Sequence, residues 1–372
     1  MRPCLLITGA ALTAAAATCK PKKLFDNLVT FGDSYTDNGR LGYYINNGGN
    51  PPPPGEYQTV SNVTASGGLA WGQFVEQYTG AKYYDYAISG ATCSNEIISR
   101  LFSAINKPFP SVIDDEIPSF KADVGYKTLY ADRTSDNTVY ALWIGTNDLG
   151  FGAFLTDSQA PGTNLTTFVD CIWSVFDNIY ETGGRRFVLL NEAPLQVAPM
   201  YAAESAGGAG NNQYWQNKTL YNQTEYQYKM MEYATTVNTL FDYGVPFHLL
   251  VKARWPDAQF SIFNVHDLLT DIYNDPAAYL DAPANSHGFY HHCVATNNSD
   301  CTNAGEPASS FLWYDELHPS EKTGECFLLW PLSRYSSRFW ADGCEYLDSI
   351  IAKHFIDVVA GNSTYGTYYD HL

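Results

Sequence analysis

The chain has 372 residues, 45% of them hydrophobic and 16% charged, so it has enough apolar material for a large folded core and is unlike a disordered chain. Its net charge of −18 argues against nucleic acid or an anionic membrane surface as a partner, because both would repel it. No charged run, Ser/Gly-rich tether or internal repeat divides the sequence, so we expect one folded domain over residues 20–372.

The first residues have the pattern of a signal peptide. A basic residue, Arg2, is followed by a small apolar tract over residues 10–17, which is too short to remain in a bilayer. We therefore expect removal of residues 1–19, with an approximate cleavage point, and secretion of the mature chain. A buried N-terminal helix fits poorly beside the lysines at 20–23, and a bacterial lipid-attachment box ending at Cys19 is a poor match.

Strand and helix patterns alternate along the chain. Apolar, β-branched or aromatic runs that end in polar or glycine-bearing segments predict buried parallel strands at residues 28–31, 83–88, 138–144, 187–190 and 260–265. Apolar residues at helical spacing predict helices at residues 70–78, 165–182 and 226–241. This alternation predicts an α/β fold, a doubly wound three-layer α/β/α sandwich with a mostly parallel sheet. Its functional site is expected outside the carboxyl ends of the strands.

A Gly/Pro-rich segment, residues 46–55, would elsewhere indicate a linker. It follows the first predicted strand too closely for a compact domain to precede it. We therefore predict a long loop, rigid over its prolines, that forms a wall of the pocket.

Six cysteines follow the expected cleavage region, an even number that is typical of an oxidising compartment. Such a set allows 15 connectivities. From the spacing we predict local disulfides Cys293–Cys301 and Cys326–Cys344, which leaves Cys93–Cys171. Retention of Cys19 would break the even count.

The sequence also contains sequons for N-glycosylation, at a density typical of a eukaryotic secretory route. Their asparagines are Asn62, Asn164, Asn217, Asn222, Asn297 and Asn362.

Ser34 is a candidate nucleophile. It follows the first predicted strand and opens a polar segment, and Gly32 permits a sharp turn between the two. A serine in this position is commonly only a helix cap. The lipase pattern Gly-x-Ser-x-Gly is absent, because Thr36 occupies its last position.

Other polar groups strengthen this interpretation. Gly90 ends the second predicted strand with a backbone N–H that can face an oxyanion, and Asn147 follows the third with an amide that can donate. Asp315 and His318 are three residues apart near the C-terminus, so on a tight turn the carboxylate can orient the imidazole. Ser34, His318 and Asp315 are the three groups that activate a serine nucleophile.

Taken together, these residues resemble the ordered sequence blocks of the SGNH, or GDSL-type, hydrolase superfamily. The matching blocks are Gly32-Asp33-Ser34, Gly90, Gly145-x-Asn147-Asp148 and Asp315-x-x-His318. The extended first block, residues 31–40, also resembles fungal secreted esterases of carbohydrate esterase family 16. Asp33 and Asp148 are extra carboxylates that we expect to form hydrogen bonds to the turns.

The resemblance implies a role for each matched residue. Ser34 is the nucleophile, His318 the general base and then acid, and Asp315 the group that orients the imidazole. The backbone N–H groups of Ser34 and Gly90 and the side chain of Asn147 form the oxyanion hole. The implied reaction is two-step acyl transfer, which needs no metal and no organic cofactor.

The expected substrate is an ester of a small molecule or oligosaccharide. The fungal resemblance implies an acetylesterase that acts on hemicellulose-derived sugars. A short-chain lipase, a phospholipase or a feruloyl esterase shares the same groups, and the fold cannot separate them. The absence of a long apolar lid favours small water-soluble esters. We expect a monomer without nucleic acid or stable membrane association.

Two other classes of protein compete with this interpretation. A non-catalytic wall-binding or lectin-like protein would not need the complete Ser34, Gly90, Asn147 and His318 set. A metal site is the second alternative, on three histidines beside Cys293. No carboxylate lies at a familiar spacing, and Cys293 is expected in a disulfide. The histidines are His287, His291 and His292.

Overall fold

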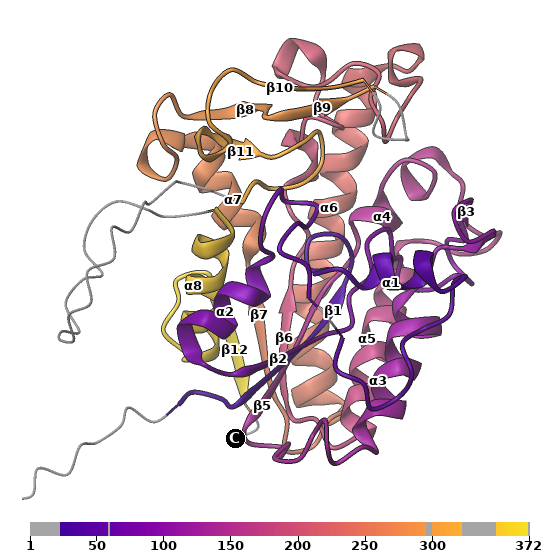
Figure 1. Ribbon diagram of the computed structural model, residues 1–372, viewed down its shortest axis with the longest axis vertical. Helices are drawn as coiled ribbons and strands as arrows, with labels where there is room; N and C mark the ends of the chain where they lie inside the picture. The colour runs from indigo at the N-terminus through magenta and orange to yellow at the C-terminus, as the bar shows by residue number, and fades with distance from the viewer. Residues whose placement is uncertain (1–22, 59, 295–299, 322–346, 371–372) are drawn as a thin grey trace, which may run out of the picture.

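The structure is a computed structural model that describes residues 23–58, 60–294, 300–321 and 347–370. Its central sheet consists of β1 (Asn27–Gly32), β2 (Lys82–Asp85), β5 (Thr138–Trp143), β6 (Arg186–Leu190), β7 (Gln259–Phe263) and β12 (Gly366–Asp370). The strand order is β12-β7-β6-β5-β1-β2 (Figure 1). All neighbours pair in parallel except the edge strand β12, which is antiparallel to β7. The order reverses between β1 and β5, where doubly wound folds bind their ligands.

Helices cover both faces of this sheet. Helices α2 (Trp71–Thr79) and α8 (Leu347–Val359) pack together on one face, whereas α3 (Ile117–Val124), α5 (Leu165–Glu181) and α6 (Gln223–Pro246) cover the other (Figure 1). The predicted three-layer α/β/α fold is therefore confirmed.

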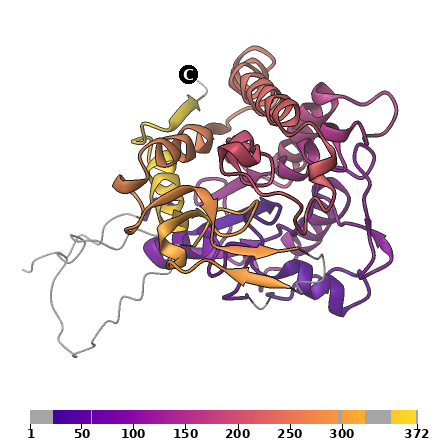
Figure 2. The ribbon, with the colours of Figure 1, turned by 90° about the horizontal axis from the view of Figure 1, so that it is seen from above.

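Short strand pairs lie above the carboxyl ends of the parallel strands, at the top of Figure 1. Figure 2 shows the orange strands among them from above. The remaining helices and strands are α1 (Arg40–Asn46), α4 (Thr146–Leu149), α7 (Val265–Asn274), β3 (Leu101–Phe102), β4 (Lys107–Pro108), β8 (Asn285–Phe289), β9 (His291–Cys293), β10 (Cys301–Asn303) and β11 (Phe311–Trp313). Single 3₁₀ or π turns lie at Val112–Glu116, Phe154–Thr156, Leu195–Val197, Glu204–Ala206, Lys218–Leu220, Phe247–Val251, Pro276–Ala278 and Ala308–Ser310.

The predicted strands form the centre of the sheet. Strands β1 and β5 are buried along their whole length, as their continuous apolar runs predict. The strand predicted at 83–88 ends at Asp85. The Asp85 carboxylate accepts hydrogen bonds from the Thr30 hydroxyl (2.7 Å) and the Ala87 N–H (3.0 Å), and so turns the chain. The prediction at 260–265 runs two residues too far, because Asn264 caps α7.

Two of the three predicted disulfides, Cys93–Cys171 and Cys293–Cys301, are confirmed. The third prediction, Cys326–Cys344, lies outside the described residues, as do the predicted signal peptide and the sequon at Asn297. The segment predicted as a loop has no regular structure after α1 ends at Asn46. In the described part of the chain, no helix has both the length and the apolar character needed to cross a membrane.

Candidate active site

Ser34 lies on a tight turn directly after β1. Gly32, the last residue of the strand, has φ +147°, and a Cβ there would lie 2.1 Å from the Trp143 carbonyl oxygen, so only glycine fits. The carbonyl of Asp33 then accepts from the N–H groups of Thr36 and Asp37, at 3.0 and 2.9 Å. This turn presents Ser34 at the carboxyl edge of the sheet with 8% of its surface exposed.

A continuous hydrogen-bonded chain joins Ser34, His318 and Asp315. The Ser34 Oγ lies 2.7 Å from His318 Nε2, and His318 Nδ1 lies 2.9 Å from Asp315 Oδ1. Asp315 Oδ1 also accepts from the backbone N–H groups of Leu317 and His318, which fixes the carboxylate beneath the ring. When Nδ1–H donates to Asp315, Nε2 is free to accept the proton of the serine hydroxyl.

The charges around His318 make it a stronger base. Burial alone would raise the pKa of Asp315, but the nearby His318 and the hydrogen bonds to the carboxylate outweigh it and hold that pKa below its usual value. Burial alone would lower the pKa of His318, but the charge of Asp315 and its hydrogen bond outweigh it and raise that pKa. Asp315 is therefore ionised at neutral pH, and it makes His318 a stronger base.

Tyr214 is a site residue that the sequence analysis missed. Its hydroxyl donates to Asp315 Oδ2 at 2.7 Å, and its ring packs against that of His318 at a centroid distance of 5.6 Å. Asn212 Oδ1 accepts from the backbone N–H groups of Tyr214 and Trp215, both at 3.0 Å, and Trp215 is fully buried. A tyrosine about a hundred residues from its partner, among 28 tyrosines, gives no local signal of this role.

The three predicted oxyanion donors follow β1, β2 and β5, which are neighbours in the sheet. Gly90 follows β2 with φ +85°, and a Cβ there would lie 2.5 Å from the Phe109 ring, so this position also requires glycine. Within the described residues, the N–H groups of Ser34 and Gly90 donate to no protein acceptor. Asn147 Nδ2 donates to the Ala91 carbonyl at 3.0 Å, beside the Gly90 turn.

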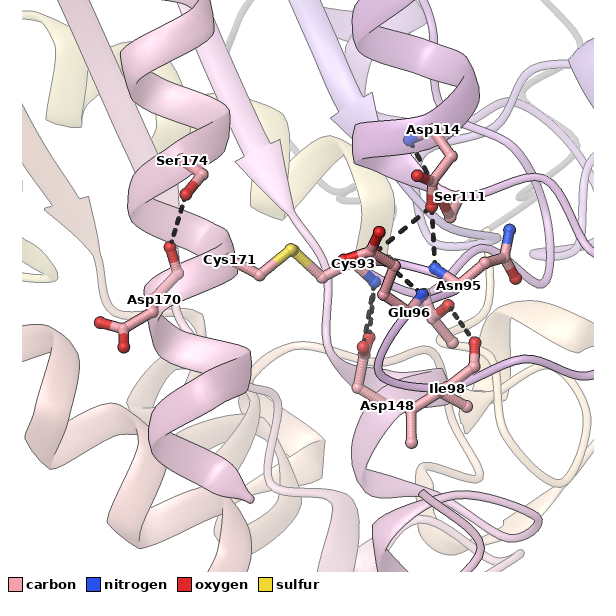
Figure 3. Close-up of a disulfide and its surroundings, with 12 residues drawn as sticks. Cys93, Asn95, Glu96, Ile98, Ser111, Asp114, Asp148, Asp170, Cys171 and Ser174 are labelled. Carbon is pink, nitrogen blue, oxygen red and sulfur yellow. Dashed lines mark hydrogen bonds between the residues drawn. A yellow bond between two sulfur atoms is a disulfide. The ribbon is translucent and has the colours of Figure 1, made fainter. Parts of the chain in front are cut away.

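The additional carboxylates hold the same turns, as predicted. Asp33 Oδ1 accepts from the Tyr35 N–H at 3.0 Å, and its Oδ2 lies 3.3 Å from Asn147 Nδ2. Asp148 Oδ1 accepts from the Cys93 N–H at 3.0 Å, next to the disulfide that ties this segment to α5 (Figure 3). Burial raises the pKa of Asp33 to about 6 and that of Asp148 to about 7.

The histidines weighed as metal ligands have other contacts. His291 Nε2 lies 3.2 Å from Cys293 Sγ, and the two sulfurs near it belong to the Cys293–Cys301 disulfide. A thiolate binds metals, whereas a disulfide sulfur offers no such charge. His292 pairs with the fully buried Glu316, next to Asp315, and the His287 ring packs on Tyr273. The His292–Glu316 contact ties β9 to the loop that carries His318.

Comparisons with known proteins place the chain in a family. Residues 28–327 match the family model of the GDSL-like lipases and acylhydrolases. An acetylesterase of Hypocrea jecorina is 52% identical over 373 residues and is covered, like this chain, over its full length. An acetylesterase of Thermothelomyces thermophilus is 31% identical over 212 residues, which cover 52% of this chain and 64% of that protein.

A solved structure of a GDSL-like protein from Parabacteroides merdae superposes with a TM-score of 0.28 at 16% identity, over 63% of this chain and 86% of that one. The family match confirms the resemblance seen in the sequence blocks. The chain therefore belongs to the family of GDSL-like lipases and acylhydrolases and is a carboxylic ester hydrolase.

Proposed function

We propose that the protein is a secreted acetylesterase, which removes acetyl groups from hemicellulose-derived sugars through an acyl-enzyme on Ser34. The observation that carries this proposal is the hydrogen-bonded chain Ser34–His318–Asp315, with 2.7 Å between Ser34 Oγ and His318 Nε2. The full-length similarity to a fungal acetylesterase supports the acetyl specificity. The low exposure of Ser34, 8% of its surface, also favours a small acyl group.

In this mechanism Ser34 Oγ attacks the ester carbonyl carbon while His318 Nε2 takes the hydroxyl proton. The Ser34 and Gly90 N–H groups and the Asn147 amide stabilise the oxyanion that forms, a contribution worth about 3 kcal/mol for each donor. Asp315 stabilises the imidazolium. The C–O bond then breaks, and the sugar alcohol leaves with the proton from His318. Water, activated by His318, attacks the acetyl-enzyme and releases acetate and free Ser34.

Two features support secretion. Disulfides persist in oxidising compartments, and the described chain contains two of them. The sequon asparagines within the described residues are all exposed, as attachment of a glycan requires. They are Asn62, Asn164, Asn217, Asn222 and Asn362.

The test is initial-rate hydrolysis of p-nitrophenyl acetate, butyrate, octanoate and palmitate, together with acetate release from acetylated xylo-oligosaccharides. We expect the rate to fall steeply after acetate, and Ser34→Ala to abolish turnover without loss of folding. Ser174→Ala is the matched control and should retain full activity, because among the described residues the Ser174 hydroxyl on α5 bonds only the Asp170 carbonyl.

Each alternative has its own outcome in this experiment. A maximum at octanoate or beyond would replace the acetylesterase with a lipase. Activity of Ser34→Ala equal to that of the wild type would remove Ser34 from the mechanism. Absence of any Ser34-dependent turnover would favour the non-catalytic carbohydrate-binding protein instead.

A further inference from the structure

A cavity of about 600 Å³, in the size range of small-molecule sites, is lined in part by residues of the turns that carry Ser34 and Gly90. Two of its lining residues belong to the turns already described. Asp37 lies three residues after Ser34, and Ser89 directly precedes Gly90. The N–H and the hydroxyl of Ser89 both donate to Asp37 Oδ2 at 2.7 Å. Two residues of the cavity lining therefore link the turns that carry Ser34 and the predicted oxyanion donor Gly90.

Tyr57 presents an aromatic face to this cavity in an unusual way. Its hydroxyl is turned inward and donates to the Tyr83 carbonyl at 2.7 Å, while its ring packs edge-on against Tyr84 at 5.9 Å. Burial of the hydroxyl raises the pKa of Tyr57 to about 12. The residue is nevertheless 55% exposed. The favourable arrangement for an exposed tyrosine places its hydroxyl in water and buries its apolar ring. Here the ring is held in place as a solvent-facing apolar platform.

The polar groups of the cavity wall fit a neutral, hydroxyl-rich ligand. The side chains of Asn46 and Glu56 line the cavity and have no hydrogen-bond partner among the described residues. Gln58 accepts from Arg40 at 3.0 Å through its Oε1, which leaves its NH₂ group to donate. No lysine or arginine belongs to the described lining, and Glu56 would repel an anion. A long acyl chain would leave these polar groups without partners.

From this juxtaposition we propose that the cavity is a subsite for the sugar half of the ester. A pyranose ring stacks its C–H face on Tyr57, its hydroxyls bond to Asn46 and Glu56, and its acetyl group reaches Ser34. The inference rests on the proposed function and specifies where the alcohol that leaves in the first step is held.

Two readouts on Tyr57→Ala test this subsite. The first is kcat and KM for an acetylated xylo-oligosaccharide and for p-nitrophenyl acetate. The second is inhibition of p-nitrophenyl acetate hydrolysis by unacetylated xylotriose. We expect KM for the oligosaccharide and the inhibition constant of xylotriose to rise about 10-fold, the effect of one lost stacking contact. The constants for p-nitrophenyl acetate should change less than about two-fold, since it carries no sugar ring.

The matched control is Tyr243→Ala on α6, a tyrosine that is 75% exposed and does not line the cavity; it should leave both constants unchanged. Asn46→Ala is a second variant, which keeps the inference testable if Tyr57→Ala does not fold. Its exposed side chain holds no other residue of the described chain, and its loss should raise the xylotriose inhibition constant several-fold.

Unchanged xylotriose inhibition in the folded variants, or equal losses on both esters, would overturn the subsite. Failure of the wild type to release acetate from oligosaccharides would overturn the proposed substrate instead. In that case Tyr57-dependent inhibition by xylotriose would still support the subsite.

Discussion

The His318 ring contacts two tyrosines that come from distant parts of the chain. The ring of Tyr35 lies 5.7 Å from the imidazole, and its hydroxyl donates to the Leu317 carbonyl at 2.8 Å. The Tyr214 hydroxyl instead donates to the carboxylate of Asp315, the hydrogen-bond partner of His318. The first contact fixes the backbone beside His318, whereas the second acts on the charge that raises its pKa. Tyr214 is therefore a positioning residue with an electrostatic effect.

Substitution Tyr214→Phe should move the pH dependence of kcat/KM. His318 must be neutral to act as a base, and its pKa is raised above the ordinary 6.5, so the wild-type rate should rise with pH with a midpoint above 6.5. Without the tyrosine hydroxyl, the full negative charge of Asp315 acts on the imidazole. The pKa of His318 then rises further, and the midpoint moves to higher pH. Rates on p-nitrophenyl acetate across pH measure both values.

The control for this substitution is Tyr84→Phe. The Tyr84 hydroxyl also donates one hydrogen bond, to the Leu129 carbonyl at 2.7 Å, but it has no contact with Asp315 or His318. A loss of stability without a shift of the midpoint is expected there. A midpoint that stays in place in Tyr214→Phe, or moves to lower pH, would refute the electrostatic role.

Among the elements, the segment after β2 depends on a covalent link to α5. Cys93 bonds Cys171 across 78 residues of sequence, and the Cys93 N–H donates to Asp148, next to Asn147 (Figure 3). The segment also contains Gly90, whose carbonyl accepts from the Arg100 guanidinium at 2.5 Å. These bonds tie the segments that carry two of the three predicted oxyanion donors to each other and to α5.

Removal of each disulfide should destabilise the protein to a different extent. The chain-entropy relation gives about 4.5 kcal/mol for the 78-residue separation of Cys93–Cys171 and about 2.5 kcal/mol for the 8-residue separation of Cys293–Cys301. The double variants Cys93→Ala/Cys171→Ala and Cys293→Ala/Cys301→Ala can be compared by denaturant unfolding. The first should lose more stability and more kcat, because it loosens the Gly90 segment. Equal losses, or the reverse order, would refute this account.

The whole molecule combines a net charge of −18 with several carboxylic acids that are buried in its core. Desolvation raises the pKa of Asp33 to about 6, of Asp148 to about 7 and of Asp85 to about 8, from the ordinary 3.8. Asp85 is raised further by the charge of Asp37. Between pH 4 and 8 the folded state therefore binds more protons than the unfolded chain.

This difference predicts that stability falls as pH rises. The slope of the unfolding free energy with pH is negative wherever the folded state holds more protons. His318, with its raised pKa, acts in the same direction above about pH 6.5, and the lowered pKa of Asp315 contributes a constant amount above 3.8. Thermal unfolding should show a higher Tm at pH 5 than at pH 8.

High salt distinguishes the titration of the buried acids from repulsion among surface charges, which can also make stability depend on pH. Salt screens the repulsion among surface charges but not the titration of buried acids. A higher Tm at pH 5 should therefore persist in 0.5 M NaCl, a concentration with a Debye length of only about 4 Å. A Tm that is equal or higher at pH 8 would contradict the buried-acid account.

Much of the fold was predictable from the sequence, and so was the content of the candidate site. The five central strands are apolar runs, which the local sequence pattern predicts. The same local pattern identifies the polar or glycine residues that follow these strands, among them Ser34, Gly90 and Asn147. The edge strand β12, helices α1, α3, α4, α7 and α8, and the short strands above the sheet were not predicted. Their segments are short or mixed in polarity, so their structure depends on packing against the rest of the chain.

By itself, the sequence determined the order of the strands along the chain and the chemical groups at their ends, because both depend on local patterns of burial and turn formation. Only the tertiary structure decided which distant groups meet. The Tyr214 hydroxyl reaches Asp315 at 2.7 Å, and the Tyr57 ring is turned outward because its hydroxyl is bound inside. Such contacts join residues that are far apart in sequence, and a loop tyrosine looks the same whether or not its hydroxyl finds a partner across the fold.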